Sequence, residues 1–138
     1  MLVTAVRADD VASTVAERQA GMKAMGSKLK AIKAFADSGT GQAEAADGVA
    51  VLVATSKSIP TWFPAGSGLD SFSGKTAAKP DIWTDQAKFK AIAATFQTDA
   101  VALQQAIAAG NQAAAAAAFE TMGREACGAC HGAFRAKT

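Results

Sequence analysis

The five residues Cys127-Gly128-Ala129-Cys130-His131 constrain the fold of this chain more than any other stretch. They contain both cysteines and the single histidine of the 138-residue sequence. On an α-helix, positions 127, 130 and 131 are related by i, i+3 and i+4, so their side chains leave from one face. Two thiols and an imidazole in this pattern are typical of c-type haem attachment, in which the histidine is the proximal iron ligand. The motif therefore predicts a helix that lies against a large planar cofactor.

Three other uses of such residues fit this sequence less well. A thioredoxin-like redox pair would need a βαβ context, and the sequence shows no strand pattern. A zinc site needs about four ligands, but the motif holds every cysteine and histidine of the chain. A disulfide across three helical residues has poor geometry. The sequence thus favours one haem c per chain, bound covalently through Cys127 and Cys130 with His131 on the iron.

An apolar stripe with heptad spacing predicts a first helix from Asp9 or Asp10 to about residue 38. The stripe consists of Val11, Val15, Met22, Met25, Leu29, Ile32 and Ala36, with Arg18 in place of an apolar residue. An arginine there either extends its head to water along a packed stem or, beside a haem, pairs with a propionate. Met22 is either core packing or an axial ligand of the iron.

Three more helices are expected, over residues 42–58, about 84–109 with Thr84 as the N-cap, and about 112–136. Pro60 ends the second helix, and residues 60 to about 83 form one long connection rich in glycine and proline. The short turn at Gly110 and Asn111 makes the last two helices antiparallel. The sequence therefore predicts an all-α, antiparallel four-helix bundle with one long crossover loop between helices 2 and 3.

Composition excludes two classes of partner. The formal net charge is only +2, and no basic run is dense enough for a nucleic-acid groove. No stretch approaches the roughly 18 consecutive apolar residues of a membrane span. The length fits one domain, residues 9–138. We expect residues 1–8 to be poorly ordered, either as a signal-peptide remnant or as a start added for expression.

Four stretches give the chain a family resemblance that covers residues 10–137. They are Arg18-Gln19-x-x-Met22-Lys23, Phe63-Pro64-x-Gly66, Lys79-Pro80-x-Ile82-Trp83 and Cys127-x-x-Cys130-His131-x-x-Phe134-Arg135. In these the sequence resembles the cytochrome c′ family, together with its low-spin relatives of the same fold. The resemblance implies that Arg18 and Gln19 lie near a haem propionate, that Met22 takes the distal position and that Arg135 lies beside the proximal His131.

Three functions follow from a haem in such a bundle. The first is electron transfer to and from redox partner proteins, with His131 and Met22 on the iron. The second, which the resemblance also implies, is a five-coordinate, high-spin cytochrome c′ that binds or scavenges nitric oxide or carbon monoxide. The third is peroxidase-like catalysis, which would need a distal acid–base pair that a chain with one histidine does not supply. We expect electron transfer and no enzymatic activity.

The resemblance also bears on location and assembly. It implies a protein of the bacterial periplasm, because haem attachment in the family occurs outside the cytoplasm. It further implies that a homodimer, formed through the first two helices, is one state open to this chain.

Overall fold

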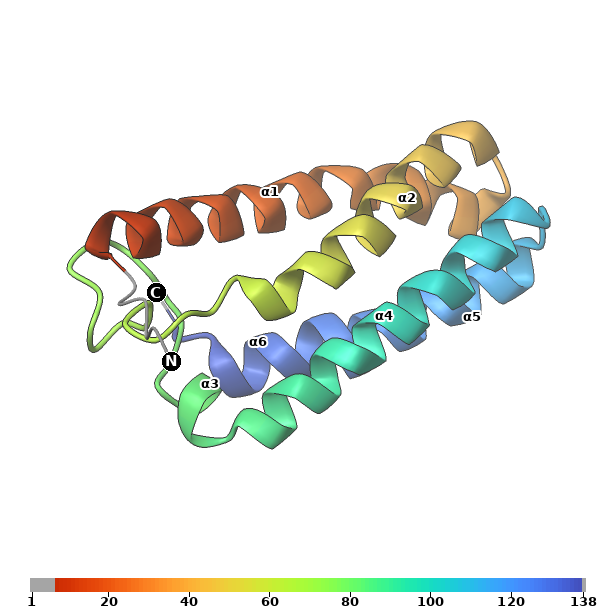
Figure 1. Cartoon of the computed structure of the whole chain (residues 1–138). Helices are drawn as coiled ribbons and strands as arrows, with labels where there is room; N and C mark the ends of the chain where they lie inside the picture. The colour runs from red at the N-terminus through yellow and green to blue at the C-terminus, as the bar shows by residue number, and fades with distance from the viewer. Residues whose placement is uncertain (1–6, 138) are drawn as a thin grey trace, which may run out of the picture.

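The computed structural model describes residues 7–137 and is built almost entirely of helices (Figure 1). The long helices are α1 (Ala8–Ser38), α2 (Gln42–Ser58), α4 (Gln86–Ala108) and α5 (Gln112–Met122), and α5 continues through the π-helical turn η2 (Gly123–Gly128) into α6 (Ala129–Phe134). Within this part of the chain, β pairing is limited to one isolated bridge between Ala78 and Arg135. The predicted all-α four-helix bundle is confirmed.

The four helical segments pack in a ring. Helix α1 packs against α2 and α5, and α4 packs against the same two helices. Neighbouring helices run in opposite directions, because two short turns join them at one end and the crossover loop joins α2 to α4 at the other (Figure 1). The apolar stripes face the middle of this ring, where Leu52, Leu103 and Ile107 are fully buried. The arrangement leaves the C-terminal helix next to the crossover loop.

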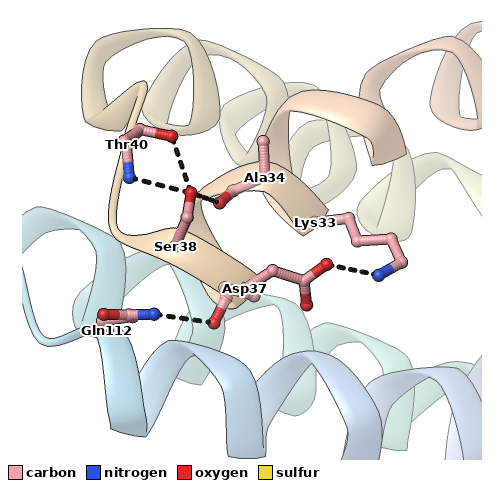
Figure 2. A network of polar contacts seen from close by, with 7 residues as sticks. Lys33, Ala34, Asp37, Ser38, Thr40 and Gln112 are labelled. Carbon is pink, nitrogen blue, oxygen red and sulfur yellow. Dashed lines mark hydrogen bonds and ion pairs between the residues drawn. The ribbon is translucent and has the colours of Figure 1, made fainter.

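The bundle end that lacks the crossover is closed by side chains around the α1–α2 turn (Figure 2). Ser38 Oγ donates a hydrogen bond to Ala34 O at 2.7 Å and lies 2.7 Å from Thr40 Oγ1. Gln112 Nε2, at the start of α5, donates to Ala36 O at 3.4 Å and joins α5 to α1.

The crossover loop contains two short helical segments, η1 (Ile59–Thr61) and α3 (Asp81–Thr84). The prediction that Thr84 is the N-cap of the third long helix is wrong. Thr84 ends α3, and Asp85, with φ −120° and ψ 55°, separates α3 from α4. The chain turns helical earlier than predicted because Ile82 is drawn into the core, where it is 3% exposed. The last helix also ends before its predicted limit, since Arg135 is extended and bridges to Ala78.

Helix α1 begins at Ala8, with Arg7 as its N-cap. The remaining residues of the predicted N-terminal segment, 1–6, lie outside the described part of the chain. Over residues 7–137, every helix is too short or too polar to cross a membrane.

Candidate functional site

A cavity of about 450 Å³ opens among α1, α4, α6 and the crossover loop. Its volume lies within the range of about 300–1,000 Å³ that is common for ligand and cofactor sites. A second, more apolar cavity of about 180 Å³ adjoins it deeper in the bundle. The two cavities share five lining residues: Met22, Phe63, Phe89, Cys130 and His131. The two cavities are therefore neighbours separated only by these side chains, and we treat them as one site.

The apolar stripe of α1 is incomplete where it passes this site. Toward the two ends of the stripe, Val15 and Ile32 are 2% and 0% exposed. Between them, Met22, Met25 and Leu29 are only partly buried, although they lie on the same face. These three side chains line the smaller cavity, so the apolar stripe faces open space there and not packed protein.

The two cysteines and the histidine meet at this site. Cys127 lines the smaller cavity, and Cys130 and His131 line both. Burial raises the pKa of the Cys127 thiol. Burial, and to a smaller extent the charge of a neighbouring Cys127 thiolate, raises the pKa of Cys130 to about 11. Both thiols are therefore protonated at neutral pH. Two causes lower the pKa of His131: partial burial, which is the larger, and the nearby Arg135 cation. The imidazole is therefore neutral and has a nitrogen lone pair that can bind a metal.

A π-helical turn precedes this group of residues. The turn η2 includes Cys127 and ends at Gly128. A Cβ at Gly128 would lie 2.9 Å from the carbonyl oxygen of Gly123, so the wide turn leaves no room for a side chain there. Sequence analysis predicted an uninterrupted α-helix and missed this turn, which is a local feature often found at functional sites.

Arg18 is almost completely buried, at 4% exposure. Its Nη1 donates hydrogen bonds to Trp62 O (3.1 Å) and Ser67 Oγ (3.0 Å), and its Nη2 donates to Ser67 O and Thr76 Oγ1 (both 2.8 Å). The guanidinium carbon lies 4.7 Å from the centroid of the Phe63 ring. The interpretation that the Arg18 head extends into water is therefore wrong. Pairing with a propionate stays a prediction, and it would have to use Nε, since both terminal nitrogens are engaged.

The remaining predicted site residues lie on the rim of the larger cavity. Gln19 and Arg135 line it together with Lys23, which was not among the predicted site residues, and its lining contains no carboxylate. Gln19 Nε2 also donates a hydrogen bond to Lys75 O at 2.8 Å. The cationic rim and the apolar interior suit a flat apolar group that carries carboxylates on one edge. Together with two thiols, one imidazole and the Met22 thioether, this arrangement fits haem c.

Sequence reasoning missed several residues that shape the site. Phe63 and Phe89 line both cavities and pack edge to face, with ring centroids 4.8 Å apart, and Phe89 packs in the same way on Phe134 at 5.4 Å. The sequence signals for Phe63 were its place in one of the family-like stretches and its apolar ring, which suits packing of the loop against the bundle. Ser67 and Thr76 gave no signal, because they lie in a loop without periodicity.

Comparison with known proteins gives a consistent result. The sequence model of the cytochrome C′ family matches residues 13–135. Cytochrome c-556 of Agrobacterium tumefaciens (strain II Chrys) is 35% identical over 131 residues, which cover 91% of this chain and 99% of that protein.

Two solved structures are also similar. A cytochrome c′ variant from Alcaligenes xylosoxidans, in the ferrous form with bound NO, superposes with a TM-score of 0.79 and 28% identity, over 98% of this chain and 100% of that one. A cytochrome c′ with an unusual ligand-controlled dimer dissociation superposes with a TM-score of 0.82 and 26% identity. The match covers 97% of this chain and 100% of that one.

Proposed function

The chain belongs to the cytochrome c′ family of haem c proteins, and from that premise we propose that it transfers electrons through one haem c attached to Cys127 and Cys130. The observation that carries this proposal is the placement of Met22 and His131. They come from α1 and α6 and line the same two cavities. A thioether and an imidazole that face one space are a suitable pair of axial ligands for a haem iron.

Each group of residues has a distinct part in this function. When bound, haem c supplies an iron that accepts or gives up one electron. The neutral imidazole of His131 and the sulfur of Met22 hold the metal position from two helices. The cationic rim of Lys23 and Arg135 attracts the carboxylate edge of the haem. The apolar walls exclude water, and a fixed ligand pair keeps the rearrangement between the two redox states small.

A second function is favoured by the smaller cavity. Its volume of about 180 Å³ and its apolar lining, which includes Met25, Leu29 and Leu52, suit a small uncharged gas beside the haem. If Met22 does not bind the iron, the sixth position is open to nitric oxide or carbon monoxide. The similar Alcaligenes structure with bound NO supports this alternative.

The proposal extends to partners, location and assembly. We place the protein in the bacterial periplasm, where its redox partner proteins would meet it, since the relatives are bacterial. It acts as an electron carrier and not as an enzyme. A homodimer is consistent with the similar cytochrome c′ whose dimer dissociates under ligand control.

Replacing Met22 distinguishes the two functions. We expect wild-type ferric protein to show the weak long-wavelength charge-transfer band of a methionine–histidine haem, and the reduced protein to bind carbon monoxide slowly. Met22→Ala should remove the band and speed carbon monoxide binding, as measured by absorption spectroscopy and stopped-flow mixing. Met25→Ala is the matched control, because Met25 lines only the smaller cavity, and it should keep the band. A high-spin ferric wild type with rapid carbon monoxide uptake would contradict electron transfer through this ligand pair.

A further inference from the structure

Arg18 connects two parts of the chain that are far apart in sequence. Its four terminal N–H groups donate to residues 62, 67 and 76 of the crossover loop. One acceptor, Ser67, is itself completely buried. Among the described residues, Arg18 has no carboxylate partner, so the loop alone compensates the buried charge. Hydrogen bonds from a charged donor are stronger than those between neutral groups.

Two further contacts hold the same loop against the same turn of α1. A Cβ at Gly21 would collide with the indole ring of Trp62, so the absence of a side chain lets Trp62 lie directly on the helix. Gln19 Nε2 holds the carbonyl of Lys75 at 2.8 Å. The loop is thus attached to α1 along residues 18–21, immediately before Met22.

The attachment reaches the cavity through Phe63. The Arg18 guanidinium lies over the Phe63 ring at 4.7 Å, within the range of a cation–π contact. Phe63 lines both cavities and packs on Phe89. Displacement of the loop would therefore move a wall of the site and free the turn of α1 that carries Met22.

We propose that Arg18 is a positioning residue that latches the crossover loop onto α1 and so sets how closely Met22 and Phe63 close the distal side of the site. The effect of this latch on ligand binding rests on the proposed function, because it requires a haem bound in the site. When it is closed, the Met22 turn is held in place and small ligands reach the iron slowly. When it is broken, the loop and the turn move apart and the distal side opens.

Three variants of the haem-loaded protein test the latch. Arg18→Lys keeps the charge but loses the planar fork that serves four acceptors. Ser67→Ala removes one acceptor without altering a cavity wall. Lys30→Gln removes an exposed cation of α1 that lines neither cavity, and it is the control for charge. The first readout is trypsin cleavage after the exposed Lys75, whose rate follows the population of the open loop.

The latch predicts an order of effects. Cleavage after Lys75 should be about tenfold faster in Ser67→Ala, which corresponds to one hydrogen bond to a charged group. It should be about a hundredfold faster in Arg18→Lys, which loses more of these hydrogen bonds, and unchanged in Lys30→Gln. The association rate of carbon monoxide with the ferrous protein should rise in the same order.

The opposite outcomes are equally clear. Unchanged cleavage in Arg18→Lys, or equal cleavage rates in Arg18→Lys and Lys30→Gln, would show that Arg18 contributes only charge. The cleavage result is independent of the iron ligands. If wild-type spectra lacked the Met22–iron bond, electron transfer through that ligand pair would be overturned, while the order of cleavage rates would still decide for or against the latch.

Gly21→Ala tests the same attachment from the helix side. The added methyl group should push Trp62 away and speed cleavage after Lys75. Gly26→Ala is the matched control on α1, because a Cβ there has no neighbour within 4 Å. Equal cleavage rates in the two variants would contradict the close packing of the loop on α1.

Discussion

Two charged side chains of the bundle, the buried Arg18 and the partly buried Asp99, have sharply different surroundings. Arg18 has four hydrogen-bond acceptors around its guanidinium. Asp99, on α4, has a buried Oδ2 without a hydrogen-bond partner among the described residues. Burial and then the negative charge of Glu125 raise the pKa of Asp99 above 3.8. Arg18 therefore stabilises the fold through its contacts, whereas ionised Asp99 opposes it.

Replacing Asp99 should stabilise the protein at neutral pH. The native state holds the Asp99 proton more tightly than the unfolded state, so the free energy of unfolding falls as the pH rises from 3.8 through the raised pKa. Asp99→Ala removes this penalty and an unpartnered buried oxygen, so the free energy of unfolding at pH 7 should rise. Denaturant unfolding at several pH values measures the gain, which should shrink below pH 3.8.

Glu125→Gln provides the control for this prediction. Removing the neighbouring negative charge should lower the pKa of Asp99 and recover part of the same gain. A gain from Asp99→Ala that is equal at low and neutral pH would show that it comes from helix propensity and not from the carboxylate.

At the level of the elements, the π-helical turn η2 is the least regular part of the bundle. It places Cys127 in a wide turn and Cys130 in the α-helix that follows. Gly128 allows the turn to pass close to the carbonyl of Gly123. The turn therefore depends on glycine at one position and not at the other.

Two glycine replacements test this dependence. Gly128→Ala should destabilise the protein by about 1–3 kcal/mol, the usual cost of forcing an extra group into a packed region. Gly123→Ala should stabilise it by about 0.5–1 kcal/mol, because a Cβ at Gly123 has no neighbour within 4 Å and alanine is the better helix former. Chemical denaturation compares the two variants. Equal stabilities would mean that the segment is a regular α-helix.

Much of the fold could be predicted from the sequence because it depends on local patterns. The heptad stripe of α1 and the breaks at Pro60 and Gly110 are such patterns, and they gave the bundle and its crossover. The position of Arg18 in the stripe also marked it as unusual. Its acceptors could not be predicted, since Ser67 and Thr76 reach it only through the tertiary path of the loop. The π turn was missed for a similar reason, as its width depends on backbone packing.

At the scale of the whole molecule, charge is divided along the bundle. The half nearer the crossover loop consists of residues 7–23, 50–97 and 123–137. It carries eleven basic residues (Lys and Arg) and seven acidic residues (Asp and Glu). The other half carries three basic and five acidic residues. All residues that line the larger cavity belong to the half nearer the crossover loop. The two carboxylates of a bound haem reduce the positive excess there but do not reverse it.

This asymmetry should steer small redox reagents. Oxidation of the ferrous protein by an anionic metal complex should slow as ionic strength rises, because salt screens the attraction to the positive end over about 10 Å at 0.1 M. Oxidation by a cationic complex should become faster under the same change. Stopped-flow rates at several salt concentrations measure both. The same salt dependence for both reagents would show that charge at this end does not guide the encounter.

The central claim is that this bundle holds one haem c through Cys127 and Cys130, and intact-mass measurement tests it most directly. Protein matured in a host with a haem-attachment system should carry the mass of the chain plus one haem, which should survive acid–acetone extraction. Cys127→Ala and Cys130→Ala should each keep at most one thioether bond, and the double variant should lose its haem on extraction. Wild-type protein that releases its haem under the same treatment would contradict the claim.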